Sequence, residues 1–200
     1  MNVKIYFSGL YIAGCLLLTG ACDKKPATHT SFTKADSLTE TYLALQDTML
    51  QVWNTMIHDD NRKIKAMHHL LHELRVSNPE KREELKNYEE RLDDLMAMRY
   101  DQQSLSKSEM VSEYDFASNS LVTELISLAE AQNEFAYNTT LQKLVDSIRS
   151  ADQRVGNYRE EYDLIASRFN RFIERNRAML EEIDDDSNIE KKPLFQMAAE

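Results

Sequence analysis

The stretch LQKLVDSIRSADQRVGNYREEYDLIASRFNRF, residues 141–172, decides the fold class. Its apolar and aromatic residues recur at spacings that alternate between three and four without a break. They are Leu141, Leu144, Ile148, Ala151, Val155, Tyr158, Tyr162, Ile165, Phe169 and Phe172. This spacing places all of them on one stripe of a helix. A stripe of that length needs partner helices to cover it, so the stretch predicts a helical bundle.

Glycine and proline are distributed as an all-helical chain requires. Of the four glycines, three lie within the first 20 residues, and Gly156 is the only one in the remainder. Pro26, Pro79 and Pro193 fall between or outside the periodic segments, where they interrupt no helix. We therefore predict an all-α fold, an antiparallel bundle of about four long helices over residues 36–180. An acidic linker and C-terminal tail, residues 181–200, would follow it.

Local signals predict the helix boundaries. Asn78 followed by Pro79 is typical of a helix start, because the side chain can cap and the proline fits the first turn. We expect loops at residues 102–108 and 138–140, with the third helix reaching Phe135 and the fourth ending near Leu180. In the tail, we expect Pro193, Leu194 and Phe195 to dock back on the bundle.

The first helix, expected to begin at Asp36 or Ser37, carries two apolar stripes separated by the polar residues 58–63. Such an interruption indicates either a stutter that shifts the seam or a buried ionic layer. We prefer the stutter, because buried charge is costly unless it is fully paired.

The formal net charge of −10 argues against a nucleic-acid partner, since phosphate binding needs a positive face. Both cysteines, Cys15 and Cys22, lie near the N-terminus, so the bundle has no disulfide framework.

Residues 1–21 have the pattern of a secretory signal: a basic start, an apolar run and then small residues. Thr19, Gly20 and Ala21 before Cys22 resemble the bacterial lipobox, in which the cysteine is acylated. We favour Cys22 over Cys15 as the lipidated residue. A plain secretory signal or an uncut anchor is the alternative. Residues 22–35 would then form a flexible tether, and the chain would be a membrane-anchored lipoprotein of the bacterial cell envelope that most simply faces the periplasm.

Scattered positions along the chain form a recognisable set. A Trp is followed at nine and ten residues by two basic residues, and the C-terminal half carries Arg, Tyr, aromatic and Asn positions and a closing Lys-Pro segment that ends in Phe. These residues are Trp53, Arg62, Lys63, Arg159, Tyr162, Phe169, Asn170, Lys192, Pro193 and Phe195. The set resembles the pattern of the LemA family of bacterial envelope proteins. The resemblance implies a helical bundle at the cell envelope. It supplies no reaction.

Three clusters could bind a ligand. His68 and His72 share a helix face beside His69, a spacing that can hold a transition metal, although solvated or interface histidines fit as well. A calcium-like alternation of acidic residues in 184–190 lacks the required glycine, so we interpret it as a solvated linker. A basic ridge, Arg168, Arg171 and Arg175, either complements the helix dipole or faces lipid headgroups or an acidic partner.

These observations favour a lipid-anchored, non-enzymatic protein with an interaction or scaffolding role. We expect the membrane and a protein partner or a second copy as its contacts, and no cofactor. The alternative is a periplasmic metal- or small-ligand-binding sensor, for which the histidine cluster and the tyrosines are the candidates. No Ser-His-Asp or Cys-His set suitable for catalysis is evident in the sequence.

Overall fold

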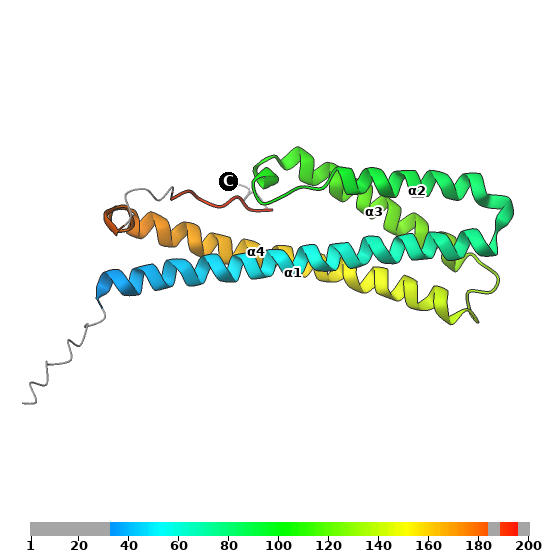
Figure 1. The fold of residues 1–200 in the computed structure, drawn as a ribbon, viewed down its shortest axis with the longest axis horizontal. Helices are drawn as coiled ribbons and strands as arrows, with labels where there is room; N and C mark the ends of the chain where they lie inside the picture. The colour runs from blue at the N-terminus through cyan, green and yellow to red at the C-terminus, as the bar shows by residue number, and fades with distance from the viewer. Residues whose placement is uncertain (1–32, 184–188, 196–200) are drawn as a thin grey trace, which may run out of the picture. The chain divides into compact units, whose positions relative to one another are not determined.

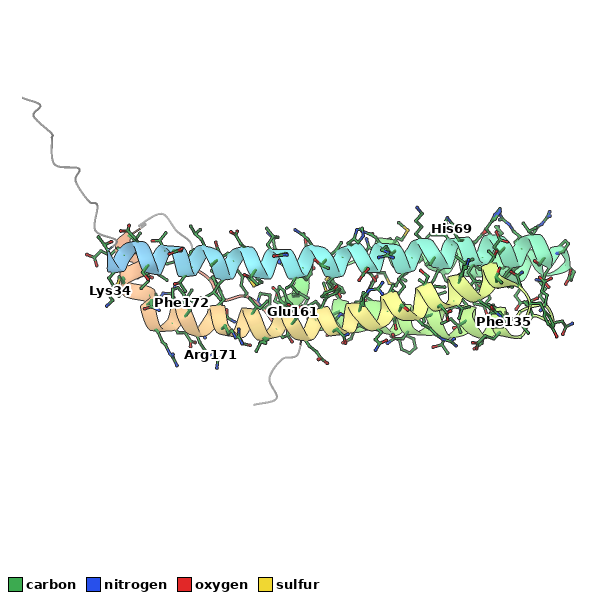
Figure 2. The ribbon with its side chains drawn as sticks, turned by 90° about the horizontal axis from the view of Figure 1, so that it is seen from below. Lys34, His69, Phe135, Glu161, Arg171 and Phe172 are labelled. Carbon is green, nitrogen blue, oxygen red and sulfur yellow. The ribbon has the colours of Figure 1, made fainter. Side chains whose placement is uncertain are left out.

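Two long helices that run in opposite directions, α1 (Lys34–Ser77) and α4 (Thr139–Ile183), form the frame of the structure (Figure 1). The structure is a computed structural model and describes residues 33–183 and 189–195. Lys34 of α1 and Phe172 of α4 lie at the same end of the pair (Figure 2). The described residues contain helices and no strand, which confirms the predicted all-α bundle.

Two shorter helices, α2 (Arg82–Ala97) and α3 (Ser108–Glu130), lie alongside the C-terminal half of α1 (Figure 1). Short 3-10 turns precede each of them, η1 (Pro79–Lys81) and η2 (Ser104–Ser106). One large apolar core joins all four helices. A smaller core fills the other end, where only α1 and α4 run side by side, and it comprises Leu38, Phe169, Ile173, Leu180 and Ile189.

The predicted stripe of α4 faces the core. Most of its members are buried, and Leu144, Tyr158 and Phe172 are half-buried against the same two cores. The helix ends at Ile183, close to the expected end. It continues through Gly156 without a break, and a Cβ atom added there would meet nothing within 4 Å.

The helix ends differ in part from the expectations. Asn78 makes no side-chain cap for the second helix. Its Nδ2 instead donates to the Leu74 carbonyl at 2.9 Å and so closes α1. Asn138 does cap α4, because its Oδ1 accepts from the backbone N–H groups of Thr140 and Leu141, each at 3.1 Å. The third helix stops at Glu130, and Phe135 packs on the core from the turn that follows.

The preference for a stutter in the first helix is wrong. Asp59, Asp60 and Lys63 are all buried, so the stripe of α1 runs through the charged residues and they form an ionic layer inside the bundle. Sequence reasoning underestimated this arrangement because it weighed the cost of burying charge without knowing the partners. Those partners come from α3, α4 and the α2–α3 connection.

The C-terminal tail, which we define as residues 189–195, docks on the bundle as expected. Ile189 is 4% exposed, and Leu194 and Phe195 pack against the large core. Residues 1–32 and 184–188 lie outside the described part of the chain. The signal sequence, Cys22 and most of the tether and of the calcium-like segment are among them. No helix within residues 33–183 is long and apolar enough to cross a membrane.

Replacing Gly156 with alanine tests whether this glycine serves the fold. The substitution should raise the free energy of unfolding by about 1 kcal/mol, because alanine favours a helix and the added methyl group meets open space. Urea denaturation measures the change. Ala178→Gly, at an exposed position of the same helix, is the matched control and should lower the free energy of unfolding by about 1 kcal/mol. A destabilising Gly156→Ala would show that the fold needs glycine there.

Candidate functional site

Lys63 lies at the centre of the buried ionic layer. Its side chain is 3% exposed, and its Nζ atom lies 2.9 Å from Ser118 Oγ, 3.1 Å from Asp152 Oδ1 and 3.2 Å from Asp60 Oδ1. These partners come from α3, α4 and α1. One ammonium group therefore joins three helices, through hydrogen bonds to Ser118 and Asp152 and an ion pair with Asp60.

Asp60 extends the layer toward α2 and α3. Its Oδ2 accepts from the Tyr114 hydroxyl at 2.5 Å and from Arg99 Nη2 at 2.8 Å. Burial, together with the negative charge of Asp60, raises the pKa of Tyr114 well above its usual value. The phenol therefore stays protonated and acts as a donor to the carboxylate.

Asp59 lies on the other side of the layer and pairs with Arg154 of α4. Arg154 donates from Nε to Oδ2 at 2.6 Å and from Nη2 to Oδ1 at 3.2 Å. Hydrogen bonding to Arg154 lowers the pKa of Asp59, against a smaller opposing effect of burial. Arg62 adds an exposed contact to the same carboxylate at 3.5 Å.

Arg159 forms a second ionic contact between α4 and α3. Its two terminal nitrogens donate to both oxygens of Asp115, at 2.7 Å and 2.6 Å, and Nη2 also donates to the Tyr100 hydroxyl at 2.6 Å. Burial raises the pKa of Tyr100 to about 12. This fork geometry fixes the position of the guanidinium group more tightly than a single ion pair would.

An aromatic cluster, Trp53, Tyr100, Tyr114, Tyr162 and Phe195, adjoins these charges. The Trp53 and Phe195 rings stack with their centroids 6.1 Å apart and their planes at 16°. Tyr162 meets both Trp53 and Phe195 edge-on, each at 5.6 Å between centroids. Burial raises the pKa of Tyr162 to about 12. The cluster therefore fastens the tail to α1 and α4.

Three side chains of α4 hold the backbone of the tail. Asp163 Oδ1 accepts from the Phe195 N–H at 2.8 Å. Asn170 both accepts from the N–H of Lys192, at 2.7 Å, and donates to its carbonyl, at 2.8 Å. Arg177 Nη2 donates to the Ile189 carbonyl at 3.3 Å. The three holders are seven residues apart along α4, so they share one face of the helix.

Two small cavities open beside Gly156, between α3 and α4. One, of about 290 Å³, is bordered by Asp115, Arg159, Glu160 and Phe195 among others. The other, of about 170 Å³, reaches Lys63. The absence of a side chain at residue 156 keeps this part of the α4 surface open.

Most of the positions that match the LemA pattern lie in this region. Trp53, Lys63, Arg159, Tyr162 and Phe195 belong to the ionic and aromatic contacts described above, and Asn170 holds the tail. Pro193 lies in the tail itself. Lys192 lies beside it in the tail. The remaining two are Arg62, whose side chain is exposed, and Phe169, whose ring is tilted against that of Tyr42 in the smaller core with the centroids 5.4 Å apart.

The histidine cluster is not assembled into a metal site. His68 is half-buried, whereas His69 and His72 are exposed, and His69 lies on the side of α1 that faces away from α4 (Figure 2). Among the residues that the structure describes, no three His, Cys, Asp or Glu side chains are grouped to hold a metal ion.

The basic ridge is exposed along α4. Arg168, Arg171 and Arg175 all lie on the surface, and Arg171 points away from α1 (Figure 2). The neighbouring cations behave differently, because Arg177 pairs with Glu181 and Lys191 pairs with Glu174.

Sequence reasoning missed most of the partners in the ionic layer. Tyr114 fits an apolar stripe of its helix, and no pattern in the sequence selects Arg99, Asp115, Ser118, Asp152 or Arg154. One signal was available: Asp60 and Lys63 are three residues apart and lie at stripe positions of a helix. Residues that continue an apolar stripe while carrying charge indicate a buried polar layer when opposite charges stand one turn apart.

The charged side chains of this region are paired with one another. The cationic groups of Lys63, Arg154 and Arg159 are engaged by carboxylates, and the phenols of Tyr100 and Tyr114 are kept protonated by burial. Groups held in this way stabilise helix packing and tail docking.

A comparison of the chain with protein-family profiles, with curated proteins and with solved structures finds no match.

Removing the ammonium group of Lys63 tests the ionic layer. Lys63→Met should lower the free energy of unfolding by about 3 kcal/mol, because it leaves buried carboxylate oxygens without their cation. Urea denaturation followed by circular dichroism measures the loss. Lys65→Met, at an exposed position of α1, is the control and should change stability by less than about 0.5 kcal/mol. A Lys63→Met protein as stable as the control would contradict the structural role of the layer.

The ion pair between α2 and α3 should make stability depend on pH. Arg91 donates to both oxygens of Glu124, at 2.7 Å and 2.8 Å, and these bonds together with that from Ser120 lower the Glu124 pKa to about 2 from the usual 4.5. A lowered carboxyl pKa stabilises the folded state above pH 4.5, and this contribution disappears as the pH falls toward 2.

We therefore expect Glu124→Gln to be less stable than the wild type at neutral pH and to converge with it near pH 2. Denaturation curves across this pH range measure the difference. The effect should be modest and should shrink in high salt, because the Glu124 side chain is 36% exposed. Glu113→Gln, at an exposed position of the same helix, is the control. A constant difference between Glu124→Gln and the wild type at all pH values would contradict this account.

Proposed function

We propose that this chain is a lipid-anchored, non-enzymatic protein of the bacterial envelope, similar to the LemA family, with an interaction or scaffolding role. The expected tether leads to α1, which begins at Lys34 and extends for 44 residues. The charged groups at the centre of the bundle are engaged with one another, which favours a structural use over a catalytic one. A rigid bundle on a short tether suits a protein that presents a binding surface near a membrane.

The observation that carries this proposal is an exposed apolar surface between α2 and α3. Phe116 is 80% exposed and Met98 is 37% exposed, and both border a cavity of about 490 Å³. Arg91 and Asp94 lie at the same cavity. Exposed aromatic and methionine side chains with an arginine nearby are typical of protein-binding surfaces.

Crosslinking in intact cells, followed by mass spectrometry, tests the proposal. The wild type should capture a protein partner, and Phe116→Ser should lose most of that capture. Tyr137→Ser is the matched control, because Tyr137 is 90% exposed in the turn between α3 and α4, and it should capture as the wild type does. Cys22→Ala should lose the capture through loss of the anchor. Equal capture by all four chains would contradict the proposal.

A second candidate function, binding of a small ligand, is favoured by the space around Gly156. A glycine inside a helix costs about 1 kcal/mol relative to alanine, and neither close packing nor the backbone requires one here. The adjoining cavities of about 290 and 170 Å³ carry charged groups from Asp115, Asp152 and Arg159. The measurement is the melting temperature of the protein with and without envelope extract. This function is favoured if the extract raises the melting temperature of Gly156→Ala but not that of Gly156→Leu.

A further inference from the structure

The tail is attached to α4 in the way that a bound peptide is attached to a receptor. Asp163, Asn170 and Arg177 bind N–H and carbonyl groups of the tail backbone rather than its side chains. Backbone contacts of this kind accept any extended segment in the right register. The identity of the segment is then read at the few positions where its side chains enter the bundle.

Two side chains of the tail serve as anchors. Ile189 enters the smaller core, where it is 4% exposed. Phe195, six residues later, stacks on Trp53 and lies edge-on to Tyr100 and Tyr162, and the Arg159 guanidinium lies 5.0 Å from its ring centre. A pocket with three aromatic walls and one cation favours an aromatic side chain over an aliphatic one.

The segment between the anchors carries Glu190 followed by two lysines, and it is loosely covered. Lys191 pairs with Glu174 of α4, and Lys192 Nζ lies 6.0 Å from the centre of the Phe169 ring. Lys191 is exposed, and residues 192–195 are only half-buried. The contacts in this stretch therefore complement positive charge without enclosing the segment.

The groove is wider than the tail that lies in it. On one side, a cavity of about 680 Å³ separates Lys191, Lys192 and Pro193 from Gln102 and Gln103 of the α2–α3 connection. On the other side, the cavity of about 290 Å³ described above borders Phe195.

We propose that this groove is a peptide-binding site that the tail occupies in cis, and that a protein partner inserts an extended segment into it. The segment would carry an aliphatic residue, then basic residues, and an aromatic residue six positions after the aliphatic one. This inference rests on the interaction role proposed above and names a binding site for it that is separate from the Phe116 surface. The tail and the partner segment compete for the same groove.

A labelled peptide with the sequence of residues 189–195, IEKKPLF, is the probe. It is titrated into the detergent-solubilised full chain while fluorescence anisotropy is measured. Phe195→Ala, which weakens the chain's own tail, should bind the probe at least about tenfold more tightly than the wild type does. A probe with alanine in place of its phenylalanine should lose this binding. Tyr137→Ala, an exposed change outside the groove, should bind as the wild type does.

A second measurement uses the wild type and therefore does not depend on the folding of Phe195→Ala. A probe with a photoreactive phenylalanine analogue at its last position should crosslink to the segments of the protein chain that contain Trp53, Tyr100 or Tyr162. Absence of binding to a helical Phe195→Ala protein, or crosslinks only outside the groove, would overturn the proposal. Crosslinks between the tail of one copy and Trp53 of another, without the probe, would overturn the assignment of the groove to a separate partner.

A negative result for the groove differs from a negative result for the interaction role. The peptide titration uses purified protein and needs neither the lipid anchor nor a cell. A chain that binds no peptide but still captures a partner through the Phe116 surface would keep the interaction role and lose only the groove.

Discussion

The burial of one ammonium group, that of Lys63, constrains the rest of the structure. A buried charge is tolerated only where carboxylates and hydroxyl groups surround it, and here they come from three helices. Any sliding of α1 against α4 would separate Lys63 from Asp152 and remove the contact of the buried ammonium group with α4. Apolar stripes tolerate small shifts, whereas this contact does not. The ionic layer therefore specifies how the helices are aligned, while the apolar cores supply most of the stability.

The ionic layer and the docking of the tail are linked through α4. The stripe that contains Tyr162 packs on α1, and a neighbouring face carries Asp152, Arg159, Asp163 and Asn170 in succession. The first two of these residues bind α1 and α3, and the last two bind the tail. Once Lys63 and Asp152 fix α4 against α1, the holders of the tail are also fixed. A groove for an extended segment thus follows from the helix alignment.

The sequence was sufficient to predict α4 and the all-α fold, because ten apolar residues repeat along a single stripe. It was also sufficient to predict the docking of the tail through Leu194 and Phe195. It could not distinguish a stutter from an ionic layer at Asp60 and Lys63. The partners of Lys63 on α3 and α4 are 55 and 89 residues away along the chain, and only the folded structure brings them together. The same holds for the cavities beside Gly156, which depend on the spacing between α3 and α4.

Native-state hydrogen exchange of the full chain tests most directly whether the ionic layer fixes the helix alignment. If it does, the backbone amides of α1 around Lys63 and of α4 around Asp152 exchange only through global unfolding, as slowly as those around Leu70 and Leu125 in the apolar core. The opposite result would be faster exchange around Lys63 and Asp152, through local opening, while the apolar core stays protected. That result would contradict the account, because the charged layer would then be a weak point of the bundle.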